Sequence, residues 1–250
     1  MKAMILAAGL GTRLRPLTND RPKALVEVAG RTLLEITIAR LREFGVGEVI
    51  INVHHFAGMV TEYLHEKNNF GMRIEISVED SLLDTGGGLK KAAWFFRDEG
   101  PEAVPFILHN VDVISTIDLR RMLEFHTQKN ALATLAVQQR QTSRYLLFDE
   151  QMWLCGRRLV KERKTELVRP SPQLHEVAFS GIHVISPRLL RMMSEEGAFS
   201  IVQSYLRLAG EGERILAYRA DCDYWRDLGN PESVALAAED LKKQTQSRSD

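Results

Sequence analysis

The first half of the chain alternates short apolar runs rich in β-branched residues with longer segments in which apolar residues recur every three to four positions. This alternation is typical of a parallel sheet covered by helices. The apolar runs predict strands at 2–6, 49–53, 73–78, 104–109 and 131–137. The periodic segments predict helices at 32–44, 59–67, 88–97 and 118–129, with Asp118 as the N-cap of the last one.

After about residue 137 the pattern changes to shorter strands and hairpins around a polar, basic stretch at 157–172. We expect strands at 145–148, 153–154, 178–185 and 214–219, and helices at 187–193, 201–208 and 232–243. The predicted fold is therefore α/β: a Rossmann-like, mostly parallel sheet flanked by helices, with a small β-rich insertion in the second half.

The overall charge excludes several classes of binding protein. Lys and Arg number 33 against 33 Asp and Glu, so the chain has no global basic field for nucleic acid or an anionic membrane. No apolar run approaches the roughly 20 residues that a membrane span needs. The two cysteines show no metal-ligand spacing, and we expect a cytoplasmic protein.

The segment after the first predicted strand, LAAGLGTRLRPLT at 6–18, carries candidate chemistry. Gly9 and Gly11, with small residues beside them, let backbone N–H groups approach an anion closely. A third glycine and a Gly-Lys-Ser/Thr sequence are both absent, so the segment is neither a dinucleotide fingerprint nor a P-loop. Taken alone, it is explained equally well by a tight turn.

Basic residues gather around this loop. Residues 1–30 contain five Lys or Arg and two Asp or Glu, a surplus of three positive charges in a neutral chain. Arg13 follows the glycines, and Lys23 follows the stiffening Pro22. We expect the other three, Lys2, Arg15 and Arg21, to be solvated.

The loop together with RPKALVEVAG at 21–30 resembles the signature of the sugar-phosphate nucleotidylyltransferases. Further motifs of that family follow in the same order over nearly the whole chain: LDTGGG at 83–88, HNVD at 109–112, FSGI at 179–182 and WRDLG at 225–229. The resemblance implies one domain at 1–244 and a polar tail at 245–250. Its expected parts are a nucleotide-binding half at 1–137, a sugar- and metal-binding half at 138–230 that contains the β-rich insertion, and a C-terminal helix at 231–244.

The resemblance implies transfer of a nucleotidyl group from an NTP to a sugar 1-phosphate, with release of pyrophosphate. Arg13 would clamp the triphosphate, and Lys23 would bridge phosphates near the α-phosphorus. Asp112 and Asp227, 115 positions apart, match the family's two metal-binding aspartates, and Mg²⁺ is the expected ion. No general base is needed, because the attacking phosphate is already an oxyanion.

Further binding residues follow from the same resemblance. Residues 85–88 would open a helix whose N-terminus faces phosphate, and Glu79 would read the base or ribose. The expected nucleotide-binding residues are Leu6, Ala8, Gly9, Gly11, Thr12, Glu79, Thr85, Gly86 and Gly87, and the expected sugar-binding residues are Asn110, Ser180 and Gly181. The alternatives are helix or turn caps for the two aspartates, a solvated acid for Glu79 and a simple loop at 85–88. His54 and His55 receive no role.

The chain departs from the family at two places. Val111 stands where many members have glycine, and it would crowd the site or point into the core. The family's Glu-Lys-Pro segment is not recognisable, and the candidates to replace its lysine are Lys161, Lys164 and Arg144.

The short chain and the Thr-Gly-Gly-Gly loop resemble most closely the compact branch that includes N-acetylmuramate-1-phosphate uridylyltransferase. A UDP-sugar such as UDP-N-acetylmuramate is therefore the favoured product, and mannose- or heptose-1-phosphate guanylyl transfer is the alternative. A catalytically silent nucleotide-binding subunit is the hypothesis from another class. We expect a monomer or small homo-oligomer without nucleic-acid or membrane partners.

Overall fold

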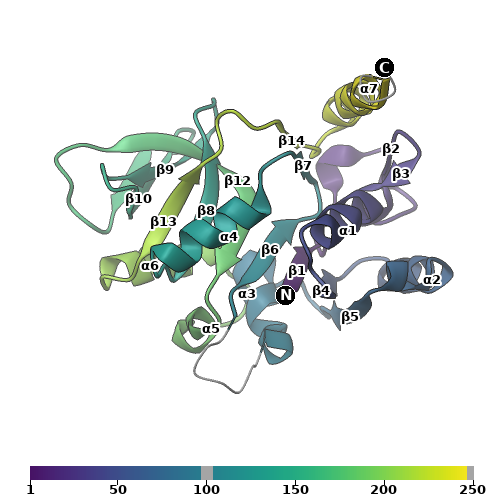
Figure 1. Ribbon diagram of the computed structural model, residues 1–250, viewed down its shortest axis with the longest axis horizontal. Coiled ribbons are helices and arrows are strands. Elements are labelled where there is room, and N and C mark those ends of the chain that lie inside the picture. The colour runs from purple at the N-terminus through teal and green to yellow at the C-terminus, as the bar shows by residue number, and fades with distance from the viewer. Residues whose placement is uncertain (97–103, 247–250) are drawn as a thin grey trace. The chain divides into compact units, whose positions relative to one another are not determined.

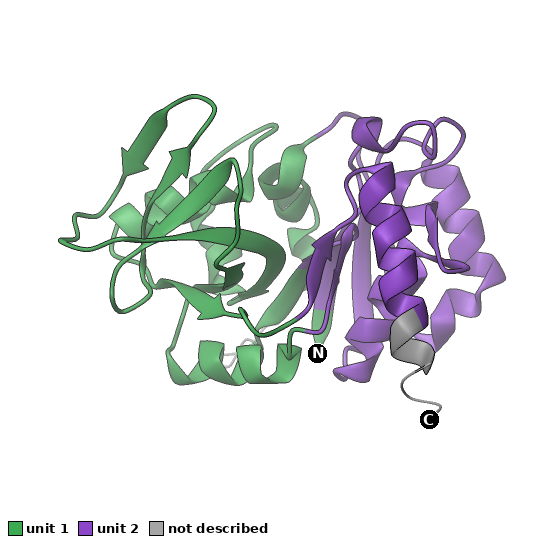
Figure 2. Cartoon of the chain, turned by 90° about the horizontal axis from the view of Figure 1, so that it is seen from above, with its two compact units in different colours: residues 1–2, 83–108, 117–223 green, residues 3–82, 109–116, 224–250 purple. Residues whose placement is uncertain are grey.

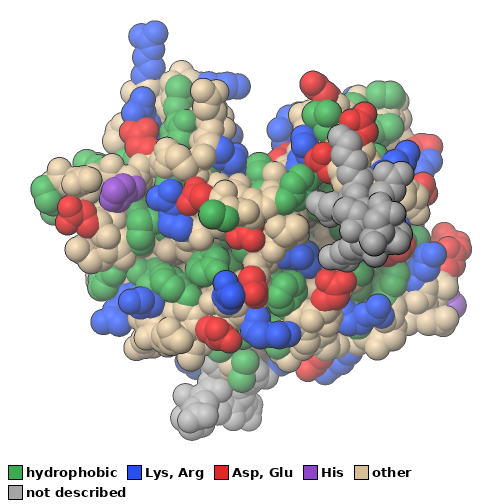
Figure 3. Space-filling model, turned by 45° about the horizontal axis from the view of Figure 1, so that its top comes forward, with side chains coloured by type: hydrophobic (Ala, Val, Ile, Leu, Met, Phe, Trp, Pro, Cys, Tyr) green, Lys and Arg blue, Asp and Glu red, His purple; other side chains and the backbone are tan. Residues whose placement is uncertain are grey.

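A computed structural model of the chain describes residues 1–96 and 104–246. The chain divides into two compact units, coloured separately in Figure 2. Unit 1 comprises residues 1–2, 83–108 and 117–223, and unit 2 comprises residues 3–82, 109–116 and 224–250. None of the helices in the described part of the chain is long and apolar enough to cross a membrane. Lys and Arg side chains are interspersed with Asp and Glu over the face shown in Figure 3.

Unit 2 is built on parallel strands with apolar sequences. Its neighbouring strands are β1 (Lys2–Leu6), β4 (Glu48–Val53) and β5 (Arg73–Val78), in that order. β4 and β5 are parallel, with Val53 opposite Val78 at their carboxyl ends. Met4 and Ile50 are fully buried, as expected for strands covered on both faces. The three strands confirm the sequence prediction.

Among the described residues of unit 2, three α-helices occur: α1 (Leu33–Glu43), α2 (Ala57–Glu66) and α7 (Pro231–Gln246), shown in Figure 1. The hydroxyl of Thr32 accepts a hydrogen bond from the N–H of Glu35 at 3.1 Å and caps α1. Leu34, Ile38 and Leu41 form the buried face of that helix. All three helices were predicted; the tail beyond residue 246 lies outside the described residues.

Two short antiparallel ladders in unit 2 were not predicted. One joins β2 (Glu27–Val28) to β3 (Arg31–Thr32), and the other joins β7 (Val113–Ser115) to β14 (Trp225–Asp227). In the second ladder Asp227 lies opposite Val113. This pairing brings the residues before α7 beside those that follow β6 (Phe106–Asn110).

Unit 1 holds the β-rich part of the second half. Its strand order is β11-β10-β9-β12-β6, with β8 beside β12 and β13 beside β8. β10 pairs antiparallel with β9 and β11, and β12 pairs antiparallel with β8 and β9, whereas β8 and β13 are parallel. Besides β6 its strands are β8 (Ala133–Gln138), β9 (Arg144–Phe148), β10 (Leu154–Leu159), β11 (Lys164–Leu167), β12 (His175–Ile185) and β13 (Ile215–Arg219).

Parts of the polar stretch at 157–172, which showed no strand pattern, belong to strands β10 and β11. They form a polar ribbon: Arg157 donates to Glu166 at 2.8 Å, and Arg158 donates to Glu176 at 2.6 Å. Because both faces of the ribbon are largely polar, its sequence lacks the alternation that identifies a half-buried strand.

The described part of unit 1 contains the α-helices α3 (Asp84–Lys91), α4 (Leu119–Gln128), α5 (Arg188–Met192) and α6 (Ile201–Gly210). Asp118 caps α4 as predicted, because its Oδ1 accepts from the N–H groups of Arg120 and Arg121. The predicted helix at 88–97 is displaced: α3 begins before its glycines and is followed by a short 3-10 turn, Ala93–Phe96. Residue 97 lies outside the described residues.

Candidate functional site

The loop after β1 is shaped by Gly11. Its backbone has φ +65°, a left-handed conformation that glycine adopts without strain. Its carbonyl accepts hydrogen bonds from the N–H of Leu14 and the hydroxyl of Thr18, both at 2.8 Å. A Cβ at this position would lie 3.3 Å from the Cβ of Lys23. Gly11 is therefore required by the local fold.

Gly9 differs from Gly11 in its exposure, its backbone conformation and its packing. It is exposed, its φ is not in the left-handed region, and a Cβ at this position would meet no heavy atom within 4 Å. Nothing in the part of the chain that the structure describes requires glycine at this position. A backbone that must let another molecule approach closely would require it.

Asp112 and Asp227 lie next to each other although they are far apart in sequence. The N–H of Leu228 donates to the carbonyl oxygen of Asp112 at 2.8 Å, and β7 pairs with β14 immediately beyond. Burial raises the pKa of the Asp227 carboxyl, and the negative charge of Asp112 raises it further. Lys23 and Arg13 act in the opposite direction on the same pKa.

Two basic side chains accompany these acids. Lys23 forms an ion pair through its Nζ with Oδ2 of Asp112, and the side chains of both residues are 13% exposed. The N–H of Gly229 donates to Oδ1 of Asp227 at 2.7 Å. A Cβ at Gly229 would lie 2.7 Å from Nη2 of Arg13. We call Arg13, Lys23, Asp112, Asp227 and Gly229 the charged cluster.

The charged cluster combines ligands for cations with ligands for anions. Its two carboxylates supply hard oxygen donors, and Lys23 and Arg13 supply positive charge beside the glycine loop. No group of three or more His, Cys, Asp or Glu side chains is placed to hold a metal ion in the part of the chain that the structure describes. A cation on this pair of aspartates would take its other ligands from water or from phosphate, which is how Mg²⁺ is commonly held.

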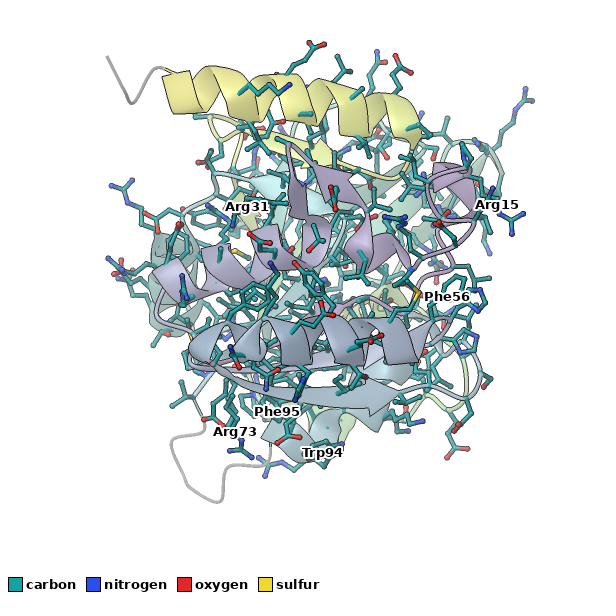
Figure 4. All side chains as sticks on the ribbon, turned by 90° about the vertical axis from the view of Figure 1, so that its right-hand side faces the viewer. Arg15, Arg31, Phe56, Arg73, Trp94 and Phe95 are labelled. Carbon is teal, nitrogen blue, oxygen red and sulfur yellow. The ribbon has the colours of Figure 1, made fainter. Side chains whose placement is uncertain are left out.

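The other basic residues of the first 30 positions were expected to be solvated. Arg15, labelled in Figure 4, and Arg21 are exposed. Lys2 corrects the expectation, because it is half-buried and its Nζ lies 5.7 Å from the centroid of the Phe95 ring. This is a cation–π distance.

Comparison with known proteins decides the family. Residues 2–244 match the family described as nucleotidyl transferase. The chain is 33% identical over 248 residues to N-acetylmuramate alpha-1-phosphate uridylyltransferase of Caulobacter vibrioides, covering 95% of each chain. The chain belongs to the nucleotidyl transferase family.

Two other similarities extend this result. The chain is 28% identical over 245 residues to mannose-1-phosphate guanylyltransferase of Mycobacterium tuberculosis, covering 96% of this chain and 64% of that protein. The crystal structure of HddC from Yersinia pseudotuberculosis complexed with GMP-PN has a TM-score of 0.75 at 22% identity, covering 96% and 99% of the chains. The predicted family, α/β fold class and enzyme class, a sugar-1-phosphate nucleotidylyltransferase, are confirmed.

Val111 does not occupy space in the charged cluster of this nucleotidyl transferase. Its side chain is 2% exposed and belongs to the apolar core, and its N–H donates to the carbonyl of Leu6 at 3.1 Å. Val111 therefore points into the core and does not crowd the site.

Glu79 is buried in this nucleotidyl transferase, with 2% of its surface exposed. Its Oε1 accepts a hydrogen bond from Nδ2 of Asn52 at 2.7 Å, and its carbonyl oxygen accepts one from Nδ1 of His54 at 2.7 Å. The alternative of a solvated acid is therefore wrong. Contact of Glu79 with a base or ribose stays a prediction.

The glycines at the start of α3 pack against the segment before α6. The N–H groups of Gly86 and Gly87 donate to the carbonyl of Phe199 at 2.9 and 3.3 Å, and the Thr85 hydroxyl accepts from the N–H of Ile201. A Cβ at Gly86 would lie 2.9 Å from the carbonyl oxygen of Phe199 and would overlap its ring. We expected the N–H groups at the start of this helix to face a phosphate. In the structure those of Gly86 and Gly87 donate to the carbonyl of Phe199 instead.

The remaining candidates divide between the two units. Ser180 and Gly181 are buried in β12 where its pairing with β8 shifts register, and Gly181 has φ +71°. Unit 1 contains Thr85, Gly86, Gly87, Ser180 and Gly181, and unit 2 contains Leu6, Ala8, Gly9, Gly11, Thr12, Arg13, Lys23, Glu79, Asn110, Asp112 and Asp227. Within unit 2 the structure joins Arg13, Lys23 and both aspartates.

The three candidates for the family's missing lysine, Lys161, Lys164 and Arg144, are exposed on or beside the ribbon β9 to β11. Sequence reasoning missed Asn52, Thr18 and Gly229, which bind or border the loop and the cluster. Thr18 and Gly229 had a signal, since they stand in the LAAGLGTRLRPLT and WRDLG motifs, whereas Asn52 had none.

Proposed function

We propose that this nucleotidyl transferase joins an NTP to a sugar 1-phosphate and releases pyrophosphate. The observation that carries the proposal is the proximity of Asp112 and Asp227 to Lys23 and Arg13, beside a glycine loop. Family membership supports the same reaction class.

In the proposed reaction an oxygen of the sugar phosphate attacks the α-phosphorus of the NTP. A new P–O bond forms while the bond to the pyrophosphate leaving group breaks. The attacking group is already an anion, so catalysis consists of positioning and of neutralising several negative charges. Arg13 and the loop N–H groups would hold the departing phosphates, and Lys23 would lie near the α-phosphate.

The two aspartates fit a magnesium ion. They supply two hard oxygen donors and leave the remaining positions to water and phosphate oxygens, the ligand set that Mg²⁺ prefers. When bound, the ion would neutralise charge on the phosphates. Asp112 and Asp227 would hold it, and Lys23 would share the carboxylate of Asp112.

N-acetylmuramate 1-phosphate and UTP are the proposed substrates. The support is the relative of that activity, which matches 95% of both chains at 33% identity. Guanylyl transfer to mannose or heptose 1-phosphate is the alternative, supported by a relative of which the chain covers 64%. The nucleotide-binding role of 1–137 and the sugar- and metal-binding role of 138–230 stay predictions.

A matrix of the four NTPs with several sugar 1-phosphates tests the proposal through pyrophosphate release, with Mg²⁺ and with EDTA. We expect turnover with at least one pair and loss by orders of magnitude in Arg13→Ala and Asp112→Ala. Arg15→Ala, which alters a solvated arginine two positions away, is the matched control. NTP binding in calorimetry without turnover for any pair would favour the silent nucleotide-binding subunit instead.

We retain the cytoplasm as the proposed location, since Cys155 and Cys222 are free thiols. A monomer or small homo-oligomer stays a prediction.

A further inference from the structure

A chain of buried polar groups connects the ends of three neighbouring strands in unit 2. The N–H of Ala7, the first residue after β1, donates to Oδ1 of Asn52 in β4 at 2.8 Å. Nδ2 of Asn52 donates to Oε1 of Glu79, the first residue after β5, at 2.7 Å. Asn52 and Glu79 are each 2% exposed. Both the oxygen and the nitrogen of the Asn52 amide therefore have hydrogen-bond partners, and these partners fix the orientation of the amide.

Glu79 is itself held by the backbone. Its N–H donates to the carbonyl of Val53 at 2.7 Å, and its carbonyl accepts from Nδ1 of His54 at 2.7 Å. Because a carbonyl only accepts, the Nδ1 of His54 carries the proton. The backbone of Glu79 is thus held by Val53, the last residue of β4, and by His54, which follows it.

The other end of the hydrogen-bond chain determines where the glycine loop begins. Ala7 is buried, so water cannot replace Asn52 as the acceptor of its N–H. At the far end of the loop, the Thr18 hydroxyl holds the carbonyl of Gly11. The exposed residues Gly9 and Leu10 lie between these two fixed points. Their N–H groups are the ones we assign to phosphate.

We infer that Asn52 is a positioning residue for the phosphate-binding loop and that Glu79 acts through Asn52 rather than on the nucleobase. This inference rests on the proposed function. Loss of the bond to Ala7 would let the start of the loop move. A displacement of about 1 Å at a catalytic centre can cost about 10²-fold in rate.

An exchange of the two polar groups tests the inference. Asn52→Asp removes the donor to Glu79 and places two carboxylates against each other in a buried site. Glu79→Gln keeps an oxygen that accepts from Asn52. In the double variant the carboxylate introduced at position 52 would accept from both the N–H of Ala7 and the amide introduced at position 79. The connection is then restored with its polarity reversed.

The readouts are kcat and KM for the NTP, together with the Kd of the NTP by calorimetry and the Tm of each variant. We expect Asn52→Asp to lower kcat/KM by about 10²-fold and to weaken NTP binding. We expect Glu79→Gln to lose less kcat/KM than Asn52→Asp, because its amide oxygen still accepts from Asn52, and the double variant to recover most of the loss. Glu75→Gln, which alters a half-exposed glutamate of β5 four positions before Glu79, is the matched control.

Two results would overturn the inference: Asn52→Asp with unchanged kcat/KM and Kd, or a double variant that folds with the wild-type Tm and recovers nothing. A Glu79→Gln variant with altered NTP preference would indicate that Glu79 contacts the nucleobase, and this result would also count against the inference. A wild-type chain that binds NTP without any turnover refutes the proposed function instead. The inference is then judged on the Kd values of the same variants.

Discussion

Gly229 lies so close to Arg13 that a Cβ at this position would sit 2.7 Å from Nη2 and 3.0 Å from Cζ of the guanidinium. The same Cβ would sit 2.5 Å from Oδ1 of Asp227, which accepts the N–H of Gly229. The backbone of Gly229 is not left-handed, so the lack of a side chain, rather than a special φ, is what the position uses.

We therefore expect Gly229→Ala to displace the guanidinium and the carboxylate together. The expected result is a fall in kcat/KM of about 10²-fold, since the chain can still fold while the charged cluster is rearranged. Pyrophosphate release and thermal unfolding are the measurements. Gly58→Ala is the control, because a Cβ there meets no atom within 4 Å. Wild-type kcat/KM in Gly229→Ala would show that Arg13 needs no fixed position.

The two aspartates of the charged cluster are expected to affect stability in opposite directions. The pKa of Asp227 is raised by burial and by the charge of Asp112, so the folded state holds that proton more tightly than the unfolded state. Stability therefore falls as pH rises from the ordinary value of 3.8 through the raised pKa, and stays lower above it. Asp227→Asn removes this cost and should raise the Tm at pH 7 without added metal.

Asp112→Asn should lower the Tm under the same conditions, because it leaves the largely buried Lys23 without its ion-pair partner. Both variants should lose nucleotidyl transfer by at least about 10²-fold. Calorimetric Tm and pyrophosphate release check the pair. Equal Tm shifts of the same sign would contradict the assigned charges.

Gly9 provides a test that separates binding from folding. Because its Cβ would meet no heavy atom of the described residues within 4 Å, Gly9→Ala should leave the Tm unchanged or slightly higher. We expect the same variant to weaken NTP binding by about tenfold, since a methyl group would intrude where phosphate approaches the backbone. Calorimetric titration with the NTP measures this effect. Unchanged affinity would remove Gly9 from the phosphate site.

Local patterns predicted most of the elements because apolar periodicity and the aspartate cap act over a few residues. β1, β4, β5 and α4 are where those signals place them to within two residues. The ladder of β7 with β14 has three residues in each strand and depends on a partner 112 positions away, so no local pattern announces it. The proximity of the two aspartates was expected only from the family motifs.

Asn52 shows a second limit. Within its strand it is one polar residue in a buried apolar run, and nothing nearby in sequence indicates that it faces Ala7 and Glu79. The glycines at 86 and 87 show the opposite limit. Their motif was recognised, but the acceptor of their N–H groups lies more than 110 positions away in Phe199.

Gly86→Ala tests the packing role of these glycines. A Cβ would overlap the Phe199 ring and lie 2.9 Å from its carbonyl oxygen, so a compensating movement is needed. Overpacking of this kind typically costs about 1–3 kcal/mol of unfolding free energy, measurable by urea denaturation. Gly47→Ala, with no atom within 4 Å, is the control. Unchanged stability with lost NTP affinity would instead favour the predicted contact of Gly86 with the nucleotide.

Acid should destabilise the chain through buried histidines. His126 bonds to the Thr134 and Ser186 hydroxyls, and burial lowers its pKa from 6.5 to about 4. Between those pH values the unfolded state binds more protons, so stability falls as pH decreases from 6.5 to 4. This difference in pKa corresponds to about 3 kcal/mol, and His109, also with a pKa lowered to about 4, adds a similar contribution.

His126→Gln should therefore reduce the loss of unfolding free energy between pH 7.5 and pH 4.5 by about 2–3 kcal/mol. Urea denaturation at the two pH values measures that loss in the variant and in the wild type. His65→Gln, which alters an exposed histidine of α2, should leave the pH dependence unchanged. If His126→Gln loses as much unfolding free energy between the two pH values as the wild type, the folded state protonates His126 with its ordinary pKa. The acid sensitivity then has another source.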